Sequence, residues 1–171
     1  MIRLLCLAAL AAAGTTPWDA DYRVLATHHL TMPVQGANSK EIQDTYTDAR
    51  SGGRVHEATD IVAPRGTPVL ATDDGVIKKL FTSVRGGFTI YQFDPTKTYC
   101  YYYAHLDHYA PGIEDNTAVH KGQVVAYVGA TGDAPEAGPH LHFEIMRLGP
   151  EKQWWKGTNI NPYPLLRAME H

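Results

Sequence analysis

The chain has 171 residues, a length that suits one domain with a single hydrophobic core. Hydrophobic residues make up 44% and charged residues 19%, which is typical of a globular protein and excludes an intrinsically disordered one. The formal net charge is -3 and lysine and arginine form no block, so the composition argues against nucleic acid as a partner.

The first thirteen residues predict an export signal rather than a part of the fold. Arg3 supplies a small positive region, residues 4–10 are apolar, and the alanines at 11–13 provide a small-residue cleavage site. The apolar run is shorter than the roughly 20 residues that cross a bilayer as a helix, and no later segment has that length. We therefore predict a signal peptide over residues 1–13, a periplasmic or secreted mature chain, and no membrane span. The alternative is a buried N-terminal helix.

The remainder divides into an N-terminal segment over residues 14–30, one domain over residues 31–165 and a C-terminal tail over residues 166–171. Residues 14–55 contain clusters of Gly, Ser and Asn and are expected to be mostly loop. From residue 55 onward, short runs of β-branched and aromatic residues recur between turn-forming residues.

These runs predict an all-β fold of antiparallel sheets with few short helical turns. Residues 106–122 are expected to form a longer loop. The predicted strands cover residues 59–62, 68–71, 75–81, 87–93, 98–105, 123–128 and 141–147.

Cys100 is the only cysteine that remains after removal of the signal, so no internal disulfide is predicted. Strict alternation of side chains along a strand would place it on the face opposite Tyr103 and His105. We interpret Cys100 as a small buried hydrophobic residue rather than a nucleophile. Tyr103 could line a groove beside His105 or pack across strands.

His140 and His142 are two residues apart, so on a strand both point to one face while Leu141 and Phe143 point to the other. Both histidines could chelate one ion, or one could bind the ion while the other reaches a substrate. The spacing leaves both possibilities open.

His56 and Asp60 are four residues apart, which on a helix would place them on one face. The β-branched residues that follow and Pro64 argue against a helix. We therefore expect His56 to end a loop and Asp60 to begin a strand. With His105, these histidines and the carboxylate suit a catalytic metal site, which keeps a position open for water, better than a closed structural one.

The short sequence motifs around these residues, here called words, are more specific than the residues alone, and they occur in order along residues 31–165. The words are Asp60-Ile61-Val62-Ala63-Pro64-Arg65-Gly66-Thr67-Pro68-Val69, Asp74-Gly75-Val76, Tyr103-Ala104-His105-Leu106, Lys121-Gly122-Gln123 and Gly138-Pro139-His140-Leu141-His142-Phe143-Glu144. In these words the chain resembles the lysostaphin-type (LytM-like) zinc metalloendopeptidases, which cut peptide crosslinks of bacterial peptidoglycan.

The resemblance implies a β-rich groove of the barrel-sandwich hybrid type and one Zn²⁺ ion. It implies that His56, Asp60 and His142 bind the zinc and that His105 and His140 flank the zinc-activated water as catalytic groups. The family usually has glycine where this chain has Ala58, and alanine disfavours a positive φ. That departure bears on the geometry of the loop and not on the ligand assignment.

We therefore predict an exported, monomeric zinc metalloendopeptidase that acts on peptidoglycan stem peptides or crosslinks. The alternatives are a non-catalytic LytM-like module that activates a cell-wall amidase, and a zinc peptidase that acts on another secreted peptide. The amidase-activating modules have typically lost zinc ligands or catalytic histidines, and the five retained positions favour an enzyme.

Two further interpretations concern residues outside these words. Residues 14–55 are long enough to plug the site, with Asn38, His28 or His29 donating a ligand. Trp154 and Trp155 could grip a substrate or simply pack.

Overall fold

The structure, a computed structural model, describes residues 16–169. The predicted signal peptide over residues 1–13 and the last two residues of the tail lie outside this range. Two α-helices occur within it, α1 (Asp19–Thr27) and α2 (Tyr163–Arg167), together with one 3₁₀ turn, η1 (Ser51–Gly53). Neither α-helix has the length and apolar composition that crossing a bilayer requires.

Strands form most of the regular secondary structure in the described residues, as the sequence predicted. They are β1 (Ala49–Arg50), β2 (Arg54–Val55), β3 (Thr59–Val62), β4 (Pro68–Leu70), β5 (Gly75–Ser83), β6 (Gly87–Phe93), β7 (Tyr99–Tyr109), β8 (Ala118–Val119), β9 (Val124–Val128), β10 (His140–Leu148) and β11 (Gly157–Ile160).

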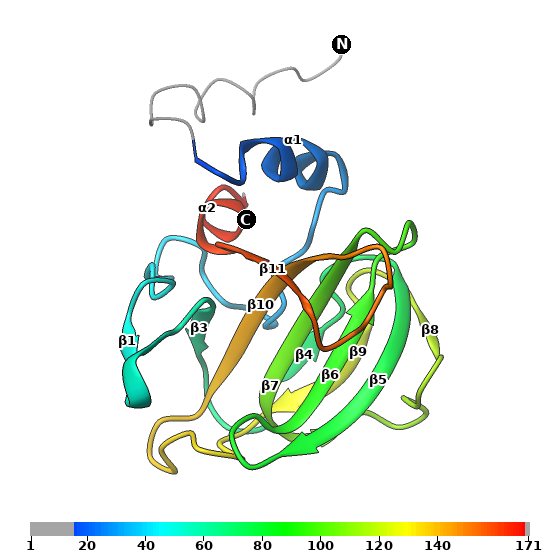
Figure 1. Cartoon of the computed structure of the whole chain (residues 1–171). Coiled ribbons are helices and arrows are strands. Elements are labelled where there is room, and N and C mark those ends of the chain that lie inside the picture. Colours follow the sequence, from blue (N-terminus) through cyan, green and yellow to red (C-terminus); the bar gives the residue numbers. More distant parts are fainter. Residues whose placement is uncertain (1–15, 170–171) are drawn as a thin grey trace.

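Nine of these strands form one sheet, and every pairing between strands is antiparallel. The main path runs β11-β10-β7-β6-β5-β8, while β3 pairs with β10, and β9 bridges β4 and β7. Strands β1 and β2 form a separate small hairpin. Figure 1 shows the long strands β5, β6 and β7 curving side by side, with both helices at the other end of the molecule from the β5–β6 turn.

The predicted strands over residues 59–62 and 87–93 match β3 and β6 in their bounds, and the others differ at their ends. The expectation of loop over residues 14–55 is wrong for α1 and for the β1–β2 hairpin. The expectation of loop over residues 106–122 is wrong at both ends, because β7 continues to Tyr109 and β8 follows. Strand β7 continues because its last residues pair with β9.

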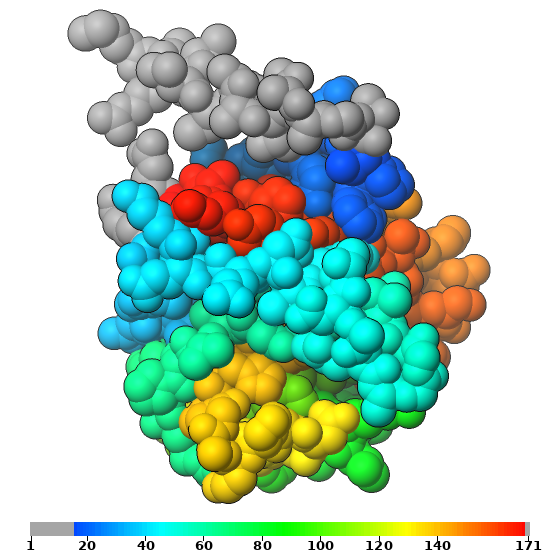
Figure 2. Space-filling view, turned by 90° about the vertical axis from the view of Figure 1, so that its left-hand side faces the viewer, coloured from blue at the N-terminus to red at the C-terminus, as the bar shows by residue number. Residues whose placement is uncertain are grey.

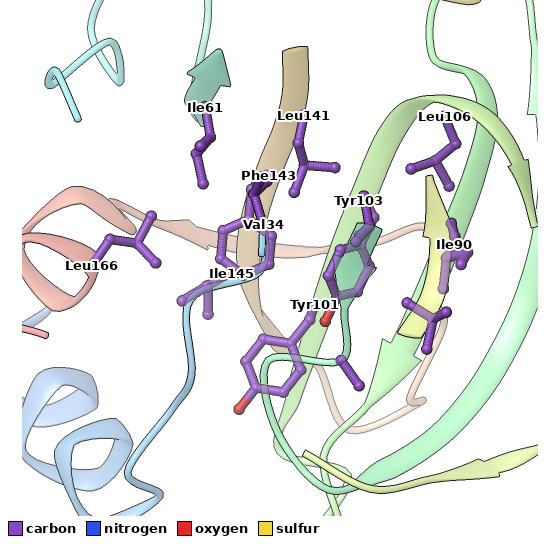
Figure 3. Packing of buried hydrophobic residues seen from close by; sticks show 14 of the residues in the cluster. Val34, Ile61, Ile90, Tyr101, Tyr103, Leu106, Leu141, Phe143, Ile145 and Leu166 are labelled. Atoms are coloured by element: carbon purple, nitrogen blue, oxygen red, sulfur yellow. The ribbon is translucent and has the colours of Figure 1, made fainter. Parts of the chain in front are cut away.

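One face of the sheet packs into the main hydrophobic core. Alternate residues of β10 point into it, and Leu141, Phe143 and Ile145 are fully buried. Figure 3 shows these side chains beside Ile61 of β3 and Leu166 of α2. The alternation predicted for residues 140–143 is therefore confirmed, and the two histidines of β10 lie on the other, outer face.

A β-bulge reverses the alternation in β7. Phe88 pairs with Leu106 and Ile90 pairs with Tyr103, so two residues of β7 oppose one residue of β6. The extra residue is His105, whose φ of 60° is left-handed, as in one class of β-bulge. Leu106, the next residue, therefore points into the core, where strict alternation from Tyr103 would have placed His105.

The bulge overturns the predicted faces of the neighbouring residues. Tyr103 lies in the core, where its hydroxyl donates to Gln92 Oε1 at 2.8 Å, so it does not line a groove. Tyr102, rather than Tyr103, shares the outer face with His105. Cys100 is also on the Tyr102 side, so its predicted position opposite His105 is wrong.

A second, smaller hydrophobic cluster covers part of the outer face. Cys100 is fully buried there against Phe93 and Met146, and the chain after β10 folds over them so that Trp154 packs on the cluster. Burial raises the pKa of the Cys100 thiol well above its usual value. The interpretation of Cys100 as a buried hydrophobic residue and the packing role of Trp154 are therefore confirmed, while Trp155 is 58% exposed.

Candidate metal centre

The part of the outer face that this second cluster leaves open is hollowed into a pocket of about 620 Å³. Its floor consists of residues from β7 and β10. Its walls are the β1–β2 hairpin, the β5–β6 turn and the loop over residues 133–138. In Figure 2 the hairpin (cyan) and this loop (yellow to gold) lie on the same face of the molecule. All five site residues predicted from the sequence line this pocket: His56, Asp60, His105, His140 and His142.

The register between β3 and β10 brings Asp60 and His142 together. Asp60 is directly opposite His142 in the antiparallel pair. His56 lies in the short loop between β2 and β3, as predicted, and is buried. The positive φ in this loop is at Glu57 (58°), not at Ala58. Alanine at position 58 therefore meets no left-handed backbone requirement in this loop.

His56, Asp60 and His142 form a three-residue cluster whose ligand atoms all lie within 4.8 Å of one another. Asp60 Oδ1 is 2.9 Å from His56 Nε2 and 3.3 Å from His142 Nδ1. The two imidazole nitrogens are 2.9 Å apart. Three electron-pair donors from separate segments thus point at one small volume.

The donor set fits a divalent metal ion. Asp60 Oδ1 is buried and accepts no hydrogen bond from any described residue, although imidazole nitrogens surround it. Buried polar atoms without a partner are rare in folded proteins and need an explanation. Two imidazoles and one carboxylate are ligands that Zn²⁺ takes in catalytic sites. A cation shared by the three residues would satisfy this oxygen.

Three neighbouring groups orient the ligands. Thr45 O lies 2.8 Å from His56 Nδ1, and Glu144 Oε1 lies 2.9 Å from His142 Nε2, so in each ring the other nitrogen faces the cluster. Arg50 Nη2 donates to Asp60 Oδ2 at 2.8 Å. Such outer contacts fix the ring orientation of metal-binding histidines. No sequence pattern pointed to Arg50, because it belongs to a two-residue strand outside every recognised motif.

His105 and His140 lie side by side next to this cluster, with ring centroids 4.9 Å apart. His105 Nδ1 is 2.8 Å from Thr131 O, and His140 Nδ1 is 2.8 Å from Gly138 O. A carbonyl oxygen only accepts, so Nδ1 carries the proton in both rings. Each Nε2 is therefore left as an acceptor.

The pKa values of His105 and His142 are shifted in opposite directions by burial and by neighbouring charges. Burial lowers the pKa of His105 to about 4, which keeps the ring neutral near pH 7. Burial also opposes a charged His142, but contacts with Asp60 and Glu144 outweigh it and raise the pKa of His142 to about 9. Burial likewise works against an ionised Asp60, and contacts with His142 and His56 still hold the pKa of Asp60 far below its usual value. Without a metal, the cluster is an ion pair between Asp60 and protonated His142.

The three ligand candidates of the predicted plug over residues 14–55 do not line the pocket, although Arg50, Ser51 and Arg54 from the end of that segment do. His28 Nδ1 lies 2.6 Å from Asp73 Oδ2, and Asn38 Nδ2 donates to Glu41 Oε1 at 2.9 Å. Within residues 16–169, no residue before Arg50 lines the pocket. The suggestion that Asn38, His28 or His29 donates a ligand is therefore wrong for this structure.

An antiparallel sheet with an open histidine and aspartate cluster in a pocket defines a candidate metal-dependent hydrolase. Comparison with known proteins gives the family: residues 54–162 match peptidase family M23, and the chain belongs to this family. The predicted family, the peptidase class and the lysostaphin-like β fold are confirmed.

Individual relatives agree with this assignment. The chain is 37% identical to the L-Ala--D-Glu endopeptidase of Bacillus subtilis over 85% of this chain and 45% of the relative. It is 35% identical to the peptidoglycan DD-endopeptidase ShyC of Vibrio cholerae over 58% of this chain and 22% of the relative. The chain thus spans less than half the length of both relatives.

A solved structure with the same fold is the catalytic domain of the antimicrobial peptidase lysostaphin from Staphylococcus simulans. It superposes with a TM-score of 0.65 at 28% identity, over 78% of this chain and 97% of that domain. The likeness therefore extends over nearly the whole of that catalytic domain.

Proposed function

We propose that this protein is an exported zinc endopeptidase that hydrolyses peptide bonds in the stem peptides or crosslinks of bacterial peptidoglycan. The observation that carries the proposal is the cluster of His56, Asp60 and His142, with an unsatisfied buried oxygen, in the open pocket of an M23-family chain. The relatives named as peptidoglycan endopeptidases support the substrate class. The apolar residues 1–13 support export, and we propose that the chain acts as a monomer.

In this proposal His56, Asp60 and His142 hold one Zn²⁺ ion. When bound, zinc polarises the peptide carbonyl and lowers the pKa of the attacking water. His105 and His140 present Nε2 acceptors to the same pocket. They take the proton from the water and return it to the leaving amine. The neutral state of His105 near pH 7 suits it to accept that proton.

The amidase-activating module is the weaker alternative, because all five site residues that the family resemblance implies line one pocket. In a module that only binds another protein, nothing requires the Nε2 atoms of His105 and His140 to face the ligand cluster.

The decisive experiment is digestion of purified, crosslinked peptidoglycan by the mature protein, with products identified by mass. Matched samples are stripped of metal and then reloaded with zinc. We expect peptide fragments only when zinc is present. Absence of cleavage by protein that holds stoichiometric zinc would contradict the proposal.

Two variants separate the roles of the β10 histidines. We expect His142→Ala to lose zinc binding, and His140→Ala to keep zinc but lose most of its turnover, since removal of a proton-transfer group typically lowers the rate by about 10²–10⁴-fold. Zinc content by atomic absorption and turnover are measured on the same samples. Normal activity in either variant would refute the assigned roles.

A further inference from the structure

The pocket gathers an unusual share of the positive side chains. Of the seven arginines in residues 16–169, three line it, and none of the seven lysines in that range does. Arg50 is committed to Asp60. Arg54 and Arg85 form no ion pair with any acidic residue that the structure describes, and Arg54 bonds only to Ser51. Two guanidinium groups therefore remain available to an anion in the pocket.

Three acidic residues also line the pocket, so the formal charges of the arginines and the acids balance before a metal ion is counted. Asp60 is held by Arg50 and the histidines, and Glu144 is held by His142. The third lining acid, Asp133, is exposed and forms no ion pair within the described residues. A divalent cation in the ligand cluster would add two positive charges. The pocket as a whole then favours a negatively charged group on its substrate.

Arg85 extends from a fixed backbone beside the catalytic histidines. Its carbonyl accepts from Asp133 N at 2.9 Å, and the carbonyl of Gly86 accepts from His105 N at 2.8 Å. Gly132 packs so closely that an added Cβ would lie 2.0 Å from the carbonyl oxygen of Arg85. The backbone of Arg85 is therefore held in place next to His105. A backbone that is already fixed reduces the conformational entropy that this residue loses when it binds a ligand.

We infer that Arg85 and Arg54 bind a free carboxylate on a substrate residue next to the scissile bond, and so select acidic peptides. This inference rests on the proposed function and names its specificity residues. A guanidinium presents two parallel N–H groups that match the two oxygens of a carboxylate, which lysine cannot do.

The chemistry of the substrate supplies such a group. A glutamyl residue has two carboxyl groups, and only one of them continues the peptide chain, so the other is free. The B. subtilis relative is named for a bond between L-Ala and D-Glu, which places a glutamyl residue next to the cleaved bond in the substrate of that protein.

The test compares two synthetic peptides that contain an L-Ala–D-Glu bond and differ only at the free carboxylate, which is replaced by a carboxamide in the second. Hydrogen bonds to charged groups are worth about 1.5–3 kcal/mol, so we expect zinc-loaded protein to prefer the acid by roughly tenfold or more in kcat/KM. In Arg85→Gln and Arg54→Gln this preference should fall, through a higher KM for the acid. Arg85→Lys should keep part of it. Arg23→Gln, an exposed arginine on α1, should leave both activities unchanged.

Two results would overturn the inference: equal cleavage of the two peptides by the unaltered protein, or an unchanged preference in the Arg85→Gln, Arg54→Gln double variant. If the unaltered protein cleaves neither peptide but releases fragments from peptidoglycan, the proposed function stands and the cleaved bond is another one, whereas no release from either substrate contradicts the proposed function. Calorimetric binding of the two peptides to zinc-loaded protein then decides the inference alone, because tighter binding of the acid that requires the two arginines supports it and equal binding refutes it.

Discussion

Asp60 uses its two carboxylate oxygens for different partners. Oδ2 accepts from Arg50, while Oδ1 faces the imidazole nitrogens of His56 and His142. The arginine therefore fixes which oxygen is presented to a metal. The geometry of this ligand depends on a residue that does not itself bind the ion.

We expect Arg50→Gln to weaken zinc binding without unfolding the protein, because Arg50 is only partly buried. Loss of an outer partner of a metal ligand typically lowers metal affinity about 10–100-fold. Competition with a chromogenic chelator measures the affinity, and circular dichroism checks the fold. Arg147→Gln, which removes an arginine outside the pocket, is the control for affinity. Equal zinc affinity in Arg50→Gln and the unaltered protein would show that Asp60 needs no orienting partner.

The pKa of His142 predicts how the metal-free protein responds to pH. Contacts with Asp60 and Glu144 outweigh burial and raise this pKa from 6.5 to about 9, so the folded state holds a proton that the unfolded state releases. The resulting stability is fully present below about pH 6.5 and is lost as the pH rises through about 9. We expect the unfolding midpoint of metal-free protein to fall across this window.

The control for this prediction is His142→Gln, in which the dependence between pH 6.5 and 9 should disappear. Zinc-loaded protein should also lack it, because a metal ligand must be deprotonated. Urea denaturation at a series of pH values measures all three samples. A midpoint that falls equally in the variant would assign the effect to other groups.

At the scale of elements, the bulge in β7 decides which side chains reach the pocket. The sequence words predicted that His105 belongs to the site, and they predicted strands β3 and β6 within their bounds. They could not predict the bulge, because it depends on how β6 and β7 pair, and no glycine marks the left-handed residue. Strict alternation therefore left Tyr103 as a candidate for the groove, where the structure has Tyr102.

Other elements escaped prediction for reasons of length and context. Strands β1, β2 and β8 have two residues each, too few to show a period. Helix α1 carries Asp19 and Asp21 and only two buried hydrophobic residues, Tyr22 and Leu25, so its pattern is weak. Tertiary packing, rather than local sequence, stabilises these elements. The Arg50 contact was hidden for the same reason.

The β5–β6 turn and the loop that follows β9 pack backbone to backbone at Gly132. An added Cβ at Gly132, where φ is +80°, would meet the carbonyl oxygen of Arg85 at 2.0 Å. We expect Gly132→Ala to destabilise the protein by about 2–4 kcal/mol, from backbone strain and overpacking together. It should also lower activity, because the adjacent Thr131 carbonyl orients His105.

Gly112→Ala, in the loop between β7 and β8, is the matched comparison for Gly132→Ala. Its φ is +79°, but an added Cβ would meet nothing within 4 Å. Backbone strain alone predicts a loss of about 1–2 kcal/mol with unchanged activity. Chemical denaturation and turnover of both variants test the pair, and similar losses in the two would show that the close contact at Gly132 is relieved at no cost.

At the scale of the whole molecule, helix α1 is integrated into the main core. Leu25 is 1% exposed, and Asp21 is buried where it accepts from Arg147 Nη1 at 2.6 Å and from the Tyr99 hydroxyl at 3.1 Å. Figure 1 shows α1 next to α2, above the sheet. The N-terminal segment thus stabilises the domain from outside the catalytic pocket.

We therefore expect a chain that begins at Thr31 to be less stable and to gain no activity. Leu25→Ala in the full chain should cost about 2–5 kcal/mol through the cavity that it creates, whereas Val24→Ala, on the exposed side of the same helix, should cost little. Thermal unfolding and turnover are measured for all three. A shortened chain that is equally stable and more active would instead support an inhibitory role for residues 14–30.

The pairing of β3 with β10 has a consequence for unfolding. Asp60 and His142 face each other across this pair, yet more than eighty residues separate them along the chain, and those residues contain β4 to β9. An ion held by both residues would join the two ends of this long segment as a reversible cross-link. Closing a loop of such length restricts the unfolded chain most, so the chain would have to release the ion before it could open fully. Removal of the ion by a chelator would then also remove this link between β3 and β10. We expect strands β4 to β9 to open more readily and to be cut faster by other proteases in chelated protein.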